Sequence, residues 1–164
     1  MAYILIDGYN LIGTAHDDLE KERNDLIDNL KKYSEIKDHH VTVVFDGWKA
    51  GQKDQTRITT RNVTVIYSRL GETADQTIRT LLLAPDKHWI VVSSDREVAD
   101  YAATHDYASV SSAEFEKKLF LALRNQDGQS TGDRRTSLPF PRSGGNPGRL
   151  SKRQRKKMQA LSKL

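Results

Sequence analysis

The chain contains no cysteine and no long hydrophobic run, and both absences exclude whole classes of protein. Without cysteine it has no disulfide, no thiolate-bound zinc and no cysteine nucleophile. Its apolar runs are far shorter than the ~20 residues that a membrane helix needs. The acidic Asp7 also interrupts the N-terminal apolar run before a signal peptide could develop. We therefore expect a cytoplasmic protein with no membrane partner.

The net charge of +4 hides a division between two parts of the 164-residue chain. Residues 1–125 carry a net charge of −4, whereas residues 126–164 carry +8. A basic arm attracts polyanions such as nucleic acids, because binding releases their counterions. The charge pattern thus predicts an acidic body with a basic tail that favours a nucleic-acid partner.

The C-terminal part itself divides in two. Residues 126–148 are rich in Gly, Ser, Pro and Arg and have little to bury, so we expect a flexible linker. Residues 149–164 form the basic tail, in which Ser151 is suited to cap a helix. A helix this short is marginal alone in water, so we expect it to order on a partner. A solvated tail that only aids solubility is the alternative. The tail's apolar residues share one weak stripe: Leu150, Met158, Leu161 and Leu164.

Short apolar runs alternate with amphipathic stretches along residues 1–125. Strands are predicted at 3–7, 41–45, 63–67 and 89–92, with a short fifth at 107–110. Helices are predicted at 17–36, 73–83, 95–104 and 112–124, the last with Phe115, Leu119, Phe120 and Leu123 facing inward. Near-continuous apolar strands separated by helices are typical of a parallel sheet covered on both faces. The body is therefore expected to be an α/β domain with about five strands.

Acidic residues stand where the predicted strands end. Because the carboxyl ends of parallel strands share one edge of a sheet, we expect these side chains to gather there. Clustered carboxylates repel one another, and a divalent cation such as Mg²⁺ or Mn²⁺ relieves that repulsion while leaving positions for water and phosphate. Such an ion can activate water for phosphodiester hydrolysis. The acids are Asp7, Asp46, Glu72, Asp75 and Asp95.

A second interpretation of these acids stays open, because Asp and Glu also cap helices. It is weaker for Asp7, which lies at a strand-to-turn junction with no predicted helix to cap. Asn10 either fixes the turn after the first strand or orients a metal-bound water. Ser94 either caps the next helix, in a capping box with Glu97, or binds phosphate.

Other chemistries fit poorly. The sequence after the first strand lacks the Asp-x-Asp of haloacid-dehalogenase-type phosphatases and the paired acids of receiver domains. No Gly-x-Gly-x-x-Gly or Walker loop is present. The five histidines show no metal-ligand spacing and are expected at the surface.

The segment from Trp48 to Asn62 is predicted to be a basic loop beside the acids. Such a loop suits a nucleic-acid substrate, because it can hold the phosphates that flank the cleavage point. A merely solvated loop is the alternative, and Trp48 is either a base-stacking platform or a loop anchor. The basic residues expected to bind RNA are Lys49, Lys53, Arg57 and Arg61 in the loop and Lys152, Arg153, Arg155, Lys156 and Lys157 in the tail.

Four short motifs, in this order, resemble those of the YacP-like branch of the NYN domains, within the PIN-like nuclease superfamily. They are Ile-Leu-Ile-Asp-Gly-Tyr-Asn-Leu-Ile at 4–12, Val-Val-Phe-Asp-Gly at 43–47, Gly-Glu-Thr-Ala-Asp at 71–75 and Val-Ser-Ser-Asp at 92–95. The resemblance covers about residues 1–125, and the tail from Gln126 does not obviously match the family's usual ending. It implies a PIN-like three-layer α/β/α sandwich with a mostly parallel sheet.

The resemblance also implies an activity and its residues. It implies Mg²⁺- or Mn²⁺-dependent endoribonuclease activity, with Asp7, Asp75 and Asp95 as metal ligands and Asn10, Asp46 and Glu72 in support. This branch is linked to RNA turnover and to a ribosome-associated role in mRNA decay. Two alternatives remain: a non-catalytic RNA- or ribosome-binding module, and the toxin of a toxin–antitoxin pair.

Overall fold

The computed structural model describes residues 1–13, 18–51, 53–84, 86–126 and 150–164. Its strands form one sheet in the order β3-β4-β2-β1-β5-β6, in which every neighbouring pair is parallel except β3 and β4. The bounds are β1 Tyr3–Asp7, β2 His40–Phe45, β3 Thr56–Thr60, β4 Val63–Tyr67, β5 Trp89–Val92 and β6 Ala108–Val110.

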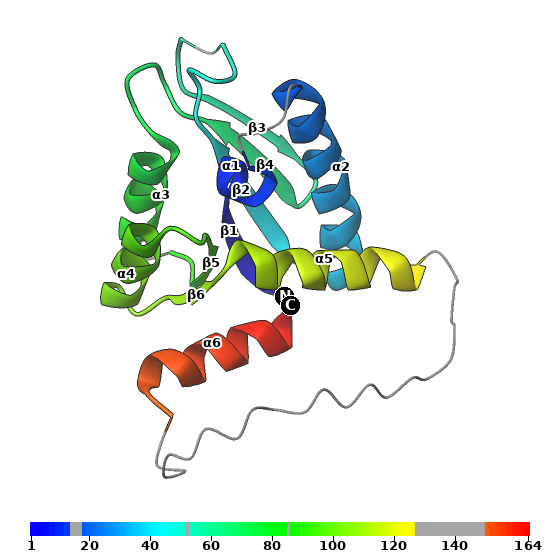
Figure 1. Ribbon diagram of the computed structural model, residues 1–164, viewed down its shortest axis with the longest axis vertical. Coiled ribbons are helices and arrows are strands. Elements are labelled where there is room, and N and C mark those ends of the chain that lie inside the picture. The colour runs from blue at the N-terminus through cyan, green and yellow to red at the C-terminus, as the bar shows by residue number, and fades with distance from the viewer. Residues whose placement is uncertain (14–17, 52, 85, 127–149) are drawn as a thin grey trace.

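Helices cover both faces of the sheet, which confirms the three-layer sandwich (Figure 1). One face packs against α1 (Gly8–Ile12), α2 (Leu19–Lys37), α5 (Ser112–Gln126) and α6 (Lys152–Lys163). The other packs against α3 (Ala74–Leu83) and α4 (Arg96–Thr104). Successive residues of β1 serve the two cores, since Ile4 and Ile6 face the first layer and Leu5 the second. No helix within the described residues is both long and apolar enough to span a membrane.

The sheet has one strand more than expected. The additional strand, β3, arises from the segment that was expected to be a loop, and it pairs antiparallel with β4. Its residues are rich in threonine and almost all exposed, as suits an edge strand. The hairpin turn is at Arg61, whose φ of 53° is left-handed.

The sequence also did not predict the short helix α1. Asp7 caps it, with its carboxylate accepting the Asn10 main-chain N–H at 3.3 Å. The expectation that Asp7 has no helix to cap is therefore wrong. Gly8 is required at this point, because a Cβ there would lie 2.2 Å from the buried Phe45 ring.

Two details of the later helices differ from expectation. Helix α4 is capped by Asp95, whose carboxylate accepts the Glu97 N–H at 2.7 Å, so the capping box with Ser94 is wrong. On α5, Phe120 is 63% exposed rather than inward, while Phe115 and Leu119 are buried as expected. The inward face of α5 passes instead through Ala122.

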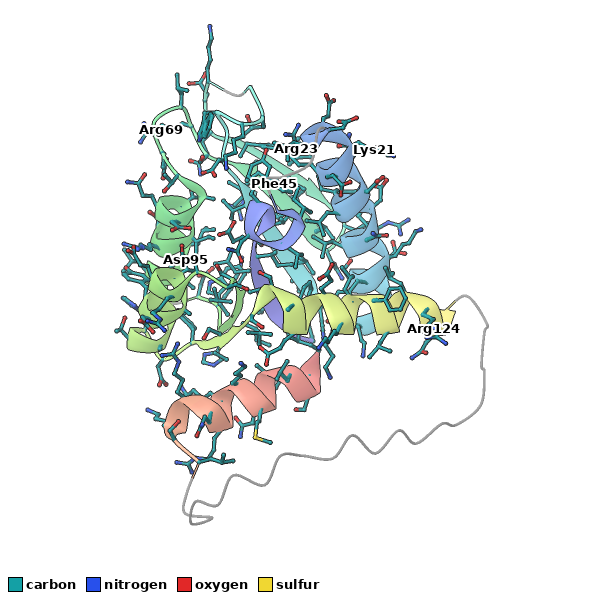
Figure 2. All side chains as sticks on the ribbon, viewed as in Figure 1. Lys21, Arg23, Phe45, Arg69, Asp95 and Arg124 are labelled. Carbon is teal, nitrogen blue, oxygen red and sulfur yellow. The ribbon has the colours of Figure 1, made fainter. Side chains whose placement is uncertain are left out.

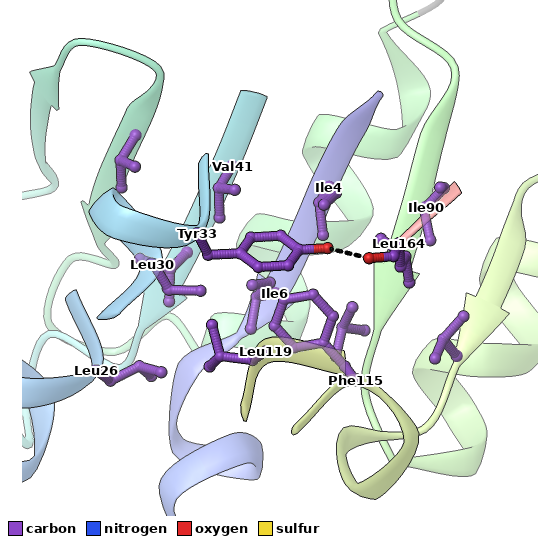
Figure 3. Packing of buried hydrophobic residues seen from close by; sticks show 14 of the residues in the cluster. Ile4, Ile6, Leu26, Leu30, Tyr33, Val41, Ile90, Phe115, Leu119 and Leu164 are labelled. Atoms are coloured by element: carbon purple, nitrogen blue, oxygen red, sulfur yellow. Dashed lines mark hydrogen bonds between the residues drawn. The ribbon is translucent and has the colours of Figure 1, made fainter. Parts of the chain in front are cut away.

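The basic tail forms α6, which packs on the chain's own body rather than on a separate partner. Ser151 caps it in a capping box with Gln154, as its position predicted. Leu164 is buried beside Phe115, and its main-chain oxygen accepts a 3.2 Å hydrogen bond from the Tyr33 hydroxyl (Figure 3). The rest of the expected stripe is less buried, and Leu150 and Met158 are exposed. Except for Gln126, the linker predicted at 126–148 lies outside the described residues.

His39 joins the two ends of the chain, contrary to the expectation of a surface histidine. It is 5% exposed, and its Nδ1 lies 3.3 Å from the Ala2 main-chain N–H that donates to it. Its Nε2 lies 2.9 Å from the Lys163 main-chain oxygen. These contacts hold the start of β1 and the end of α6 together.

Candidate functional site

The carboxyl ends of the parallel strands meet at one edge of the sheet, and four acids stand there. Asp7 is the last residue of β1, next to β2 in the register Asp7↔Val44. Asp46 directly follows β2, Asp95 follows β5, and Asp75 lies in the first turn of α3. The topology therefore brings these four residues to the same edge, as the sequence predicted.

Asp7 is the most buried of the group, with 8% of its surface exposed. Burial raises the pKa of its carboxyl to about 7, even though the hydrogen bond from Asn10 opposes the rise. The negative charges of Asp75, Asp46 and Asp95 raise it further. Each of the other three acids thus raises the pKa of Asp7.

Asp75 shows the same repulsion from the other side of the cluster. Its pKa is raised by burial first and then by the charges of Asp95 and Asp46, while Arg79 lowers it. Its carboxylate makes no hydrogen bond to another described residue, which leaves both oxygens available.

Asp46 and Asp95 each use part of their carboxylate to start a helix. Asp46 accepts the Ala74 N–H at 2.6 Å, at the first residue of α3, and lies 3.9 Å from Lys49 Nζ. Asp95 accepts the Glu97 N–H at the start of α4. Asp7 and Asp95 are therefore helix caps, and Asp46 accepts the first main-chain N–H of α3, so three of the four acids have a structural role. A cap needs one carboxylate oxygen, and the other remains free to meet a ligand.

Glu72 is not brought together with this group. Its carboxylate accepts from the Thr77 hydroxyl at 3.2 Å and lies 3.4 Å from Arg69 Nε. It precedes Thr73, the cap of α3, so it does not share a helix face with Asp75. Its supporting role in the site remains a prediction without a contact in the structure.

Asn10 ties three loops together at the acidic edge. Its Oδ1 accepts a 2.7 Å hydrogen bond from the Ser94 main-chain N–H and a 2.6 Å bond from the Ser112 hydroxyl. The Ser94 hydroxyl in turn accepts the Ser112 N–H at 3.1 Å. Asn10 therefore fixes the loops after β1, β5 and β6 relative to one another, and Ser94 belongs to this framework.

Ser112 is a member of this framework that sequence reasoning missed. It is the first residue of α5, and Ser111 separates it from the short strand β6. A small hydroxyl residue between a strand and a helix is a signal for a cap. It did not indicate that the hydroxyl would donate to Asn10 in α1.

The donor chemistry of the acidic edge suits Mg²⁺ or Mn²⁺. All four acids offer hard oxygen ligands, and their mutual repulsion favours a cation between them. Among the described residues, no three His, Asp or Glu side chains converge closely enough to ligate one ion directly. Mg²⁺ is commonly held by one or two carboxylates with water in its remaining positions, so this spacing fits a partly hydrated ion.

The basic residues of the 48–62 segment divide between two ends of the sheet. Lys49 contacts Asp46, and Arg57 pairs with Ile66 near the carboxyl end of β4. Lys53 is exposed in the loop before β3. Arg61 lies at the opposite end of β3 and forms an ion pair with Glu35 at the end of α2, so the structure does not bring it to the site.

The tail cations are largely paired with the body. Lys152 and Lys156 both contact Asp106, Arg153 lies 2.9 Å from Asp100, and Lys157 lies 2.9 Å from Glu114. These pairs hold α6 against the turn after α4 and the start of α5. RNA binding by Lys152, Arg153, Arg155, Lys156 and Lys157 stays a prediction.

An α/β sandwich whose parallel strands end in clustered carboxylates defines a protein of the PIN-like class. The sequence profile of the YacP-like NYN domain family matches residues 4–163, and the chain belongs to that family. The match includes α6, so the expectation that the tail departs from the family is wrong.

Solved structures agree with this assignment. The chain resembles a crystal structure of Rae1 (YacP) from Bacillus subtilis at 26% identity and a TM-score of 0.61, over 77% of this chain and 78% of that one. A tryptophan-to-leucine variant of the same protein gives 25% identity and a TM-score of 0.64, over 77% and 80% of the two chains. No curated protein matches the chain.

Proposed function

We propose that the chain is a divalent-metal-dependent endoribonuclease. Membership of the YacP-like NYN family supports a nuclease-type function related to RNA. The observation that carries the finer proposal is Asp7, a buried carboxyl whose pKa is raised to about 7 beside Asp75, Asp46 and Asp95. The repulsion among these carboxylates destabilises the protein without a cation, and the same carboxylates can bind a divalent cation.

The residues at the acidic edge would have different roles in this reaction. When bound, Mg²⁺ or Mn²⁺ supplies Lewis acidity and lowers the pKa of water. Asp7, Asp75 and Asp95 would hold the ion in part through its bound waters, and Asp46 would add negative charge while it anchors α3. Asn10 holds the segments that carry Asp7 and Asp95 relative to each other, and Lys49, which lies 3.9 Å from Asp46, would meet an RNA phosphate beside the acids.

The cellular role follows from the branch of the family rather than from the site. We propose a role in mRNA decay or RNA processing in the cytoplasm, with the ribosome as the partner that presents the substrate. The exposed Lys53 and Arg57 and the tail residue Arg155 would add affinity for RNA that does not depend on sequence.

A non-catalytic RNA-binding module is the second candidate, and one observation favours it. Asp7 and Asp95 cap helices and Asp46 accepts the first main-chain N–H of α3, so their presence has a structural reason without catalysis. The two candidates differ in whether RNA is cut.

Cleavage of labelled single-stranded and structured RNAs, with Mg²⁺, Mn²⁺ or EDTA and with or without ribosomes, tests the proposal. Internal cuts that appear with either metal and vanish in EDTA are expected. Binding without cleavage under every condition would favour the non-catalytic module. Equal cleavage in EDTA would contradict metal dependence.

A further inference from the structure

Trp48 is a large aromatic side chain that stands exposed on a well-anchored turn. It is 58% exposed, although the main chain around it is tied down. The Gly47 N–H donates to the Ser68 hydroxyl at 3.0 Å, and the Ala50 N–H donates to the Gly47 oxygen at 3.1 Å. Because so much of the indole is left in solvent, the ring does little to anchor this loop.

A cation lies between Trp48 and a second ring. Lys49 Nζ lies 5.5 Å from the Trp48 ring centroid and 5.0 Å from that of Tyr9. The same nitrogen is 3.9 Å from Asp46, at the long limit of an ion pair. The ammonium group is therefore held at the border between the aromatic rings and the acidic edge, with 24% of its side chain exposed.

A buried arginine supports this cluster from below. Arg23 is 9% exposed, and its guanidinium donates to the Tyr9 hydroxyl at 2.9 Å. Among the described residues it has no acidic partner, and its Nε has no hydrogen-bond acceptor. Figure 2 shows Arg23 and Phe45 next to α1, and the Phe45 ring packs edge-on against Tyr9 at 5.2 Å. No described acid therefore pairs with the positive charge beneath Tyr9.

These features together suit one nucleotide unit of a single strand. An exposed indole offers a flat face for a base, and a neighbouring ammonium offers a contact for its phosphate. Bases within a duplex are already stacked on their neighbours, so only an unpaired base can use such a platform.

We infer that Trp48 and Lys49 form a nucleotide subsite that stacks an unpaired base and binds its phosphate next to the acidic edge. The inference rests on the proposed function, because the subsite would select single-stranded RNA for cleavage nearby. It assigns Trp48 to binding rather than to catalysis.

The fluorescence of the full-length protein tests the subsite without any cleavage. A short 2′-O-methyl oligouridylate, which lacks the free 2′-hydroxyl, is titrated in EDTA. The other tryptophan, Trp89, is only 3% exposed, so quenching on binding reports on Trp48. Variants at Trp48 lack this reporter, so their affinity is measured by the anisotropy of a fluorophore attached to the same oligouridylate. Trp48→Ala is expected to weaken binding roughly 5- to 100-fold, whereas Trp48→Phe should retain most of the affinity.

Two controls separate stacking from other effects. Leu70→Ala removes another exposed apolar side chain, on the loop that contacts Lys53, and should leave affinity unchanged. An oligomer without bases should bind wild type more weakly and show no further loss with Trp48→Ala. A duplex of the same length should bind without Trp48 quenching.

Equal affinity of Trp48→Ala and wild type for the oligouridylate would overturn the subsite, even if metal-dependent cleavage is observed. Trp48-dependent binding would support it, even if no RNA is ever cut. The two results therefore judge the subsite and the proposed function independently.

Discussion

Asp7 performs two tasks with one side chain. Its Oδ1 caps α1, which fixes the turn after β1, while the carboxyl stays buried among three other acids. A cap alone would be satisfied by serine or asparagine, neither of which carries a charge. The burial of a carboxyl here is costly, as its raised pKa shows, and a cap alone does not require it.

The stability of the metal-free protein should depend on pH through Asp7. Its folded pKa of about 7 lies above the ordinary value of 3.8, so the folded state holds a proton that the unfolded state releases. This contribution is fully present below pH 4 and is lost as the pH rises to 7. Asp7→Asn should remove the loss and stabilise the protein at pH 8 by up to about 4 kcal/mol.

Denaturant unfolding in EDTA at pH 4.5 and pH 8 measures this effect. The advantage of Asp7→Asn should be larger at pH 8 than at pH 4.5. An Asp7→Asn protein that is no more stable than wild type at pH 8 would show that the carboxyl is not strained by its surroundings.

Gly8 should tolerate no side chain. The Cβ of Gly8→Ala would meet the Phe45 ring, which is fully buried and stacked on Tyr67 at 5.7 Å. We expect a loss of about 1–3 kcal/mol in the free energy of unfolding, because the ring has no space to move into. Urea denaturation measures it, and Phe45→Leu should recover part of the loss in the double variant. A loss below about 0.5 kcal/mol would contradict this packing.

At the scale of the element, α6 is a structural part of the domain rather than a free arm. Ala160 and Leu164 lie in the same core as Tyr33 and Phe115, and His39 holds the end of the helix. The cations on its other face pair with acids of the body. Deleting the tail would therefore uncover the core. A loss of RNA binding in such a deletion variant would not show that the tail itself binds RNA.

Leu164→Ala should lower the free energy of unfolding by about 2 kcal/mol, because it opens a cavity beside Phe115. Met158→Ala, on the exposed side of the same helix, is the matched control and should change it by less than about 0.5 kcal/mol. Thermal or urea unfolding distinguishes them. Equal stability of the two variants would mean that α6 does not dock in solution.

Elements with a strong apolar pattern were predictable from the sequence, and weakly patterned ones were not. The four long parallel strands are near-continuous apolar runs, and their predicted bounds agree with the structure to within a residue. Strand β3 was missed because an edge strand needs no apolar face. Helix α1 was missed because five residues show no helical period.

The same contrast applies to the site. Parallel topology alone brings Asp7, Asp46, Asp75 and Asp95 to one edge. The same argument fails for Glu72, because its contacts with Thr77 and Arg69, and not the topology, decide where its side chain lies. The contact from Ser112 to Asn10 spans 102 residues of sequence, and local patterns carry no information about such a pair.

At the scale of the whole molecule, several acids of the described body are paired with basic side chains, whereas the acids of the sheet edge have few such partners. Acids of the body at Asp100, Asp106 and Glu114 are neutralised by the basic helix α6. At the edge, the nearest cations are Lys49, at the limit of an ion pair with Asp46, and Arg79, which also pairs with Glu97. The repulsion that remains at Asp7 and Asp75 is what a divalent cation would relieve.

The most direct test is the rate of Mn²⁺-dependent RNA cleavage by Asp75→Asn. Asp75 caps no helix, and its carboxylate makes no hydrogen bond to another described residue, so this change leaves the framework of the site intact. Asp28→Asn, at an exposed position on α2, is the matched control. We predict a fall of at least about 100-fold for Asp75→Asn and none for Asp28→Asn. Full activity of Asp75→Asn would contradict a metal-dependent nuclease site at this edge.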